Sequence, residues 1–140
     1  MAITQAMCTS FKQDLMDKVM DLGSGGDTIK IALYTSSASL DSTTTAYTTS
    51  NEVSGSGYTA TGYTLQNQVV TTSGTTAYFD ADDPEWTSAS FTTAGALIYN
   101  ATASNKAIAV LSFGGDFTVT SGTFRIVFPA PGATAIVRID

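Results

Sequence analysis

Residues 28–34 read TIKIALY, and this segment sets the fold class of the chain. Its apolar residues Ile29, Ile31 and Leu33 alternate with a lysine and an alanine, which is the two-residue period of a β-strand. The alternation predicts a strand with one buried face.

Downstream of this strand, short apolar or threonine-rich runs alternate with turn residues such as Ser73-Gly74, Gly114-Gly115 and Ser121-Gly122. The runs recur about every ten residues, which is typical of an antiparallel sandwich or barrel and unlike the longer βαβ repeat. We therefore expect a mainly β fold, an antiparallel β-sandwich over residues 27–140. The expected strands are Thr28–Tyr34, Thr64–Val70, Thr75–Asp80, Phe91–Tyr99, Ala107–Phe113, Phe117–Thr120, Thr123–Phe128 and Thr134–Ile139.

Upstream of the first strand, the apolar spacing changes to that of a helix. Ser10 followed by Gln13 fits a capping box at the start, and Gly23 lies where a helix-terminating glycine belongs. We expect one N-terminal α-helix over residues 10–22, either packed on the sheet or docked on a partner subunit. Its apolar face consists of Phe11, Leu15, Val19 and Leu22.

The composition fits one folded domain over residues 1–140. The chain is 43% hydrophobic and 10% aromatic, which argues against disorder, and no apolar run is long enough to span a membrane. Only 13% of the residues are charged, and 24 threonines and 15 serines supply the missing polarity. Hydroxyl side chains of this kind suit the solvent-facing sides of β-strands.

The formal net charge of −6 argues against a nucleic-acid partner, because the six basic residues are scattered along the chain. The single cysteine, Cys8, excludes an internal disulfide and a cysteine-pair metal site. The first residues lack the pattern of a signal peptide, so we expect synthesis in a cytoplasm. Neither a nucleic acid nor a membrane is expected as a partner.

Catalysis has little support in the sequence. The chain has no histidine, which removes Ser-His and Cys-His pairs and ordinary zinc sites. It also has no phosphate-binding loop or nucleophile elbow. We therefore expect a protein that is not an enzyme, with no catalytic residues and no cofactor.

One acidic cluster, Asp80, Asp82, Asp83 and Glu85, admits three interpretations. Its alternating carboxylates could surround a hard cation such as calcium, although the spacing of a helix-loop-helix calcium loop is absent. Paired carboxylates also occur in glycosidases. The third interpretation is a solvated turn that begins at Asp83-Pro84 and returns the chain to the core at Trp86.

The aromatic residues allow a further alternative. Trp86 with Tyr58 and Tyr63 could form a stacking platform for a glycan, or the three rings could simply pack in the core.

Several segments resemble small virion proteins of tailed bacteriophages, most closely the capsid cement (decoration) proteins. Their order and spacing cover most of the chain from Ile29 onward. The matching segments are Ile31–Ser37, Tyr47–Val53, Gly57–Leu65, Phe79–Trp86, Ala96–Asn100, Val110–Asp116 and Gly122–Ile139.

The resemblance implies a jelly-roll sandwich that binds as a homodimer to the outer surface of an icosahedral head. The implied partner is the major capsid protein, and the implied function is to stabilise the shell by bridging capsomers. Acidic charge agrees with an outer position, because packaged DNA would repel it inside the shell. The N-terminal segment and the loops of residues 36–62 are the expected capsid-facing surface. The alternative is a phage tail or fibre module that recognises a host receptor, for which a stacking platform of Trp86, Tyr58 and Tyr63 would be suited.

Overall fold

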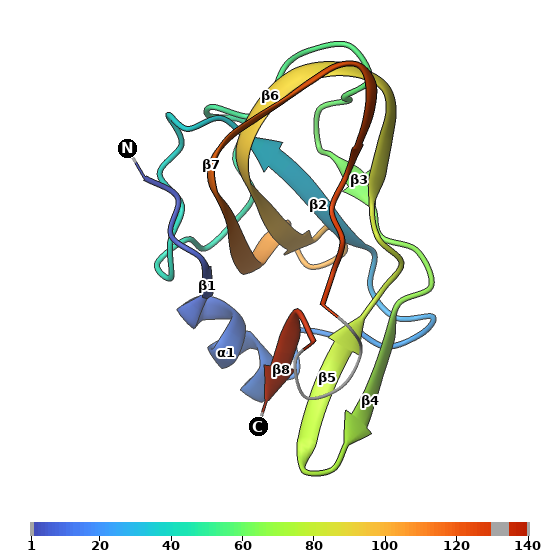
Figure 1. Ribbon diagram of the computed structural model, residues 1–140. Coiled ribbons are helices and arrows are strands. Elements are labelled where there is room, and N and C mark those ends of the chain that lie inside the picture. Colours follow the sequence, from blue (N-terminus) through green and yellow to red (C-terminus); the bar gives the residue numbers. More distant parts are fainter. Residues whose placement is uncertain (1, 130–134, 140) are drawn as a thin grey trace.

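The computed structural model describes residues 2–129 and 135–139 and consists of two antiparallel sheets and one short helix (Figure 1). The five-stranded sheet has the order β1-β7-β6-β2-β3, and the three-stranded sheet has the order β4-β5-β8. This confirms the mainly β antiparallel architecture with an N-terminal helix. The strand order does not show a jelly roll. The elements are β1 (Ala6–Met7), α1 (Thr9–Met16), β2 (Ile29–Tyr34), β3 (Tyr63–Thr64), β4 (Val69–Ser73), β5 (Thr76–Asp80), β6 (Glu85–Asn100), β7 (Lys106–Arg125) and β8 (Val137–Ile139).

The strand β2 is an interior strand of the larger sheet, between β6 and β3. All its residues are buried except Lys30, which is half-buried. The expectation of one buried face is therefore wrong. Ala32 and Tyr34 are buried on the second face, where the Tyr34 hydroxyl donates to the Thr48 carbonyl and the Lys30 ammonium to the Thr61 hydroxyl of the following loops.

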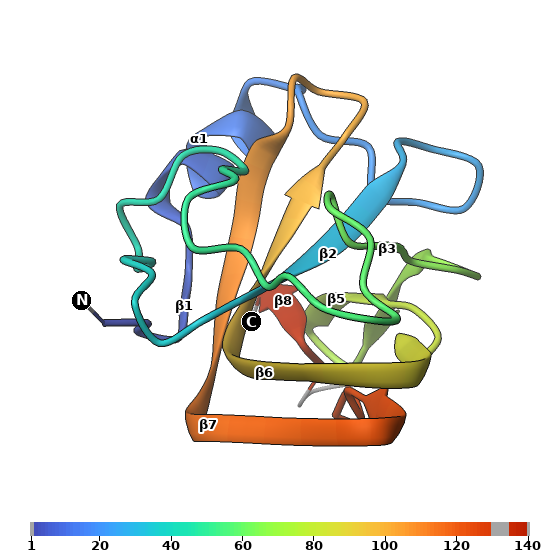
Figure 2. The same ribbon diagram turned by 90° about the horizontal axis from the view of Figure 1, so that it is seen from above.

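The longest feature is the β6–β7 hairpin, which replaces four expected strands. Residues 113–116 of β7 oppose only Ala94 of β6, because Thr93 pairs with Phe117 and Gly95 with Ser112. This bulge bends both strands sharply, as Figure 2 shows. Gly114 supplies the positive φ of 80° that the bulge requires.

A second irregularity of the hairpin lies at Ser121, which also has a positive φ and whose N–H donates to the Ser90 hydroxyl. The expected turns at Gly114-Gly115 and Ser121-Gly122 are therefore bulges inside one strand. Glycine and serine are typical of both turns and bulges, and the two can be distinguished only when the partner strand, here β6, is known.

The helix begins one residue before the expected start and ends at Met16 rather than at Leu22. The Val19 N–H bonds to the Asp14 carbonyl and the Lys18 N–H to the Leu15 carbonyl, which is the Schellman arrangement of a helix end. Lys18 takes the left-handed φ of 63° that glycine usually provides there. The helix also lacks a side-chain cap, so the expected Ser10 capping box is wrong.

The expected strand over residues 64–70 is divided between the two sheets. Tyr63–Thr64 pairs with β2, while Val69–Ser73 pairs with β5. Asn67, with a φ of 55°, turns the chain between them. The side-chain amide nitrogen of Gln68 lies 2.9–3.0 Å from the carbonyl oxygens of three residues, Leu22, Gly23 and Asp27, which share its two N–H donors. These bonds fasten the connection to the loop before β2.

Towards the C-terminus, β7 ends at Arg125, three residues before the expected strand end at Phe128, because Ile126 instead donates its N–H to the Pro84 carbonyl. The last strand is Val137–Ile139, and the expected beginning of this strand at Thr134 lies outside the described residues. The buried core is one cluster that extends from Cys8 to Val137 and draws most of its residues from β2, β6 and β7.

Candidate functional site

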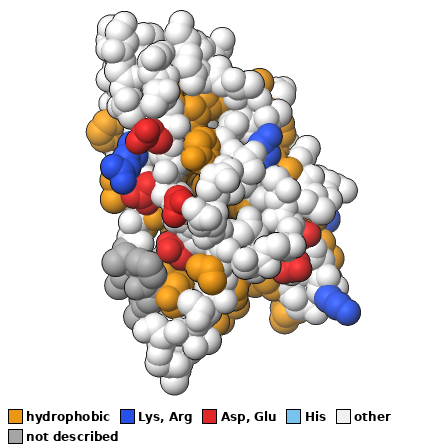
Figure 3. Space-filling model, turned by 90° about the vertical axis from the view of Figure 1, so that its right-hand side faces the viewer, with side chains coloured by type: hydrophobic (Ala, Val, Ile, Leu, Met, Phe, Trp, Pro, Cys, Tyr) orange, Lys and Arg blue, Asp and Glu red, His pale blue; other side chains and the backbone are white. Residues whose placement is uncertain are grey.

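The acidic cluster lies where β5 leads into β6. Asp80 ends β5, Glu85 begins β6, and Asp82 and Asp83 occupy the connection between them. The four residues line an open groove of about 620 Å³. Figure 3 shows acidic side chains gathered on this side of the molecule with a basic side chain beside them. The other residues that line the groove are Tyr63, Gln66, Ala81, Arg125, Phe128 and Pro129.

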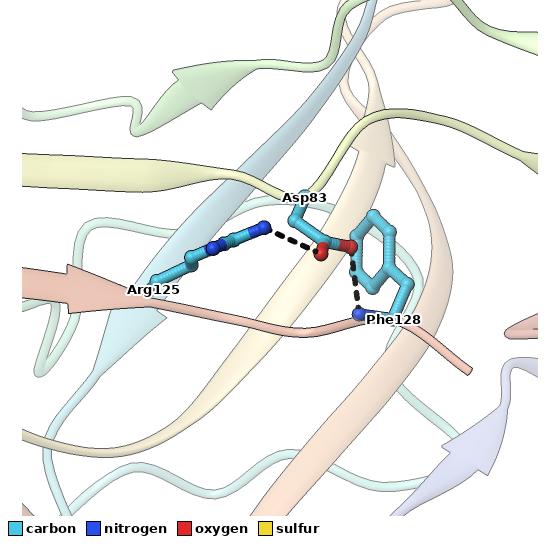
Figure 4. A network of polar contacts seen from close by, with 3 residues as sticks. All are labelled: Asp83, Arg125 and Phe128. Carbon is cyan, nitrogen blue, oxygen red and sulfur yellow. Dashed lines mark hydrogen bonds and ion pairs between the residues drawn. The ribbon is translucent and has the colours of Figure 1, made fainter. Parts of the chain in front are cut away.

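Asp83 holds two later parts of the chain against the start of β6 (Figure 4). One carboxylate oxygen accepts the backbone N–H of Phe128 at 2.9 Å, and the other faces the Arg125 guanidinium at 3.3 Å. The Arg125 side chain is 56% exposed, so its ion pair with Asp83 contributes little to stability. The main structural contribution of Asp83 is therefore the hydrogen bond that its carboxylate accepts from the backbone N–H of the buried residue Phe128.

Asp82 is also engaged in local structure. Its carboxylate accepts the Asn67 side-chain amide, and its N–H donates to the Gln66 carbonyl at 2.9 Å. In residues 2–129 and 135–139, no three acidic or cysteine side chains are placed to hold one metal ion. Of the three interpretations, the cation site is therefore not supported by the arrangement of Asp80, Asp82, Asp83 and Glu85. The carboxylates of Asp82 and Asp83 instead bind protein groups.

The aromatic residues named for a stacking platform do come together, but inside the protein. Trp86 is only 5% exposed, and its ring lies 5.7 Å from the ring of Tyr63 and 6.3 Å from that of Tyr58. Phe91 and Phe124 close the other side of the cluster. Of the two interpretations, the platform is wrong for Trp86, because the rings of Tyr58, Tyr63 and Phe124 pack against the indole and bury it.

A carboxylate that the sequence analysis missed organises the loops beside the larger sheet. Glu52 accepts the hydroxyl of Tyr47 at 2.6 Å, the hydroxyl of Tyr58 and the backbone N–H of Thr61 at 3.0 Å. The Tyr58 hydroxyl in turn accepts the N–H of Leu33 at 3.0 Å. Glu52 therefore ties the loops of residues 47–62 to β2.

The sequence did contain a signal for this cluster. Glu52 is the only charged residue between Asp41 and Asp80, and tyrosines stand five residues before it and six after it. A single charge in a long neutral stretch that also carries apolar residues needs partners when it is taken from water.

The tyrosines of this region are held in their neutral form. Burial raises the pKa of Tyr58 above its usual value of 10.0, and the hydrogen bond to Glu52 raises it further. Burial likewise raises the pKa values of Tyr47 and Tyr34. Burial and the nearby charge of Glu52 raise the pKa of Tyr99 to about 12. The rings of Tyr47 and Tyr99 stack at 4.8 Å, so the cluster is packed as well as hydrogen-bonded.

Cys8 lies fully buried immediately before α1. Burial raises its pKa to about 11, and the charge of Asp41 acts in the same direction. A thiol of this kind is protonated and shielded, which disfavours a reactive role. It packs as a small apolar side chain against Phe11 and the rest of the core.

No helix in the described part of the chain is long and apolar enough to cross a membrane. Comparisons of the sequence and the structure with protein-family models, with curated proteins and with solved structures give no match.

Proposed function

We propose that the protein is a structural virion component, a capsid cement protein that binds the outer surface of an icosahedral phage head as a homodimer and bridges capsomers. The observation that carries the proposal is a set of exposed, hydroxyl-rich strands on a well-packed β scaffold. The outer side of the bent hairpin carries Thr87, Ser88, Thr92, Thr118, Thr120 and Thr123, all exposed.

Such a surface suits contacts with a neighbouring protein. Hydroxyl groups form hydrogen bonds across an interface and cost far less to desolvate than charged groups do. The Thr92 and Thr118 hydroxyls pair across the hairpin at 2.8 Å, which orients these two side chains in the absence of a partner. A preordered surface loses less conformational entropy on binding.

The resemblance set out above supplies the partner, the major capsid protein, and the jelly-roll assignment belongs to this proposal. The protein would be made in the host cytoplasm and act on the assembled particle. The net charge of −6 supports an outer position, away from the phosphates of the packaged DNA.

Bridging gives the proposal a direct test. A dimer that contacts two capsomers gains effective concentration from the second contact, so it binds assembled, expanded shells far more tightly than free capsid protein. Co-sedimentation with shells and a pull-down with unassembled capsid protein measure the two affinities. Equal affinity for both forms would contradict the proposal.

The alternative is a tail or fibre module that recognises a host receptor. The burial of Trp86 removes the aromatic feature that favoured it. Copy number separates the two functions, because a shell component is present in hundreds of copies per particle and a tail component in far fewer. A density map of the intact particle gives the location directly.

A further inference from the structure

Within residues 2–129 and 135–139, the outer edge of the smaller sheet is a strand that no other element covers. All five residues of β4 are exposed, and β4 is the end strand of its sheet. Figure 1 shows the β4–β5 hairpin projecting from the rest of the molecule with β4 on its outer side. The end strands of the larger sheet, β1 and β3, have only two residues each, which is one way that proteins blunt an edge.

The edge of β4 lacks the other usual protections as well. It reads VVTTS and contains no proline, no lysine and no inward-pointing charge. Its register with β5 runs without a bulge from Val69 opposite Asp80 to Ser73 opposite Thr76. A straight, neutral strand with free backbone groups is a template for another strand.

The hairpin turn determines which backbone groups are free. Two residues join β4 to β5, and the first of them, Gly74, has the positive φ of 60° that a type II′ turn requires. Residues that flank such a turn exchange backbone hydrogen bonds, and the bonded pairs then alternate along the strands. The N–H and C=O groups of Val70 and Thr72 therefore point away from β5.

We propose that β4 pairs antiparallel with β4 of a second copy of this chain, with Thr71 on the two-fold axis. In this register Val70 of one copy lies opposite Thr72 of the other, so the outward N–H and C=O groups of both residues are matched in both directions. The two three-stranded sheets become one continuous six-stranded sheet. The pairing of β4 is argued from the structure alone, and only its role in bridging capsomers rests on the proposed function.

Charge explains why a second copy fits this edge. Two molecules of net charge −6 repel each other, and they approach most easily where neither presents a charge. No charged residue occurs from Val53 to Phe79, a stretch that includes all of β4. The strand is also complementary to itself, because reversal about Thr71 places each valine opposite a hydroxyl residue.

An apolar surface next to the edge adds to the contact. Val70 is 47% exposed and Ile139 of β8 is 56% exposed, on the same side of the sheet as the buried Phe79 and Val137. They border an apolar groove of about 310 Å³ between α1 and the smaller sheet. Pairing of β4 covers part of this surface, which gives the dimer a hydrophobic contribution beyond its backbone bonds.

The test uses the free protein without any capsid, so its outcome is separate from that of the shell-binding experiment. Analytical ultracentrifugation over a concentration series should show a monomer–dimer equilibrium that strengthens with added salt, because salt screens the repulsion between two acidic molecules. Thr71→Lys and Thr71→Asp should each be monomeric, and an equimolar mixture should restore a dimer. Thr75→Lys, on the exposed turn beyond β4, should leave the equilibrium unchanged.

A cross-link provides an independent measurement. The residues on the axis form a pair whose Cα atoms lie about 4.5 Å apart in this geometry, which is within the range of a disulfide. Mild oxidation should therefore give a covalent dimer from Thr71→Cys but not from Thr75→Cys, while Cys8 stays buried. A wild-type protein that is monomeric at every concentration, or a dimer that Thr71→Lys does not affect, would overturn the proposal.

Discussion

The hydroxyl of Tyr58 donates a hydrogen bond to the carboxylate of Glu52 while accepting one from the backbone N–H of Leu33 in β2. The phenol hydroxyl links the carboxylate to the backbone of β2, because it can donate one hydrogen bond and accept another at the same time. Through Tyr58, the Glu52 carboxylate, which lies outside the core, stabilises the buried strand β2.

Replacing this carboxylate should weaken the whole fold. Glu52→Gln places an amide N–H₂ among groups that already donate, so at least one of the bonds from Tyr47, Tyr58 and Thr61 is lost. We expect the free energy of unfolding to fall by about 2 kcal/mol, measured by urea denaturation. Glu85→Gln is the matched control, an exposed acid whose replacement should change stability by less than about 0.5 kcal/mol. Equal effects would contradict the role of Glu52.

The tyrosine cluster predicts a specific response to alkaline pH. The folded-state pKa of Tyr99 is raised to about 12 from its usual 10.0, and the pKa values of Tyr34, Tyr47 and Tyr58 are raised as well. A raised folded-state pKa contributes stability that is complete below pH 10 and is lost as pH rises through the folded-state value. The protein should therefore lose stability progressively above about pH 10.

Two optical signals check this response. Tyrosinate absorbance of the buried rings should rise together with the loss of near-ultraviolet circular dichroism, because the rings ionise as the fold opens. Absorbance that rises fully near pH 10 with the dichroism unchanged would show that these hydroxyls are free to ionise in the folded protein.

Asp83 and Arg125 should differ in their contribution to stability although they form one ion pair. Asp83→Ala leaves the Phe128 N–H without its acceptor and should cost about 1–2 kcal/mol. Arg125→Ala removes only an exposed partner and should cost less than about 1 kcal/mol. Urea denaturation of both variants at low and high salt makes the comparison. A larger loss for Arg125→Ala would mean that the ion pair, and not the backbone bond, is what matters.

The helix end offers a stabilising substitution. Lys18 has a left-handed backbone at the position that glycine favours, so Lys18→Gly should raise the free energy of unfolding by about 0.5–1 kcal/mol. Lys12→Gly, in the exposed interior of the same helix, should lower it by about 1 kcal/mol. Thermal unfolding of the two variants should therefore shift in opposite directions.

Local sequence patterns correctly located a strand and a turn whose positions depend mainly on neighbouring residues. The alternation at Ile29, Ile31 and Leu33 placed β2 correctly, and Ser73-Gly74 marked the β4–β5 turn. Patterns could not show that β2 is buried on both faces, because burial of its second face depends on distant loop residues such as Thr48 and Thr61. They also could not distinguish a bulge from a turn at Gly114, since that depends on β6, which lies far away in the sequence.

The candidate site shows the same division. The sequence placed the acids at the entry to β6, but Asp83 was recognised as structural only once its bond to Phe128, forty-five residues later, was visible. Trp86 suggested a binding platform, and its burial follows from packing against Tyr58, Tyr63 and Phe124, which are distant in the sequence. Partners that are distant in sequence decide the role of each of these residues.

The strand pairings imply an order of assembly. The β6–β7 hairpin closes through the short turn after Asn100, so its first pairs form with little loss of chain entropy. By contrast, β1 must find β7 across about a hundred residues, from Ala6 to Val110, and β5 must find β8 across about sixty. We infer that the hairpin nucleates folding and that the smaller sheet is completed late. Before β8 pairs with β5, the backbone groups on that edge of β5 are also unpaired. We expect incorrect strand pairing to be most frequent at this stage of folding.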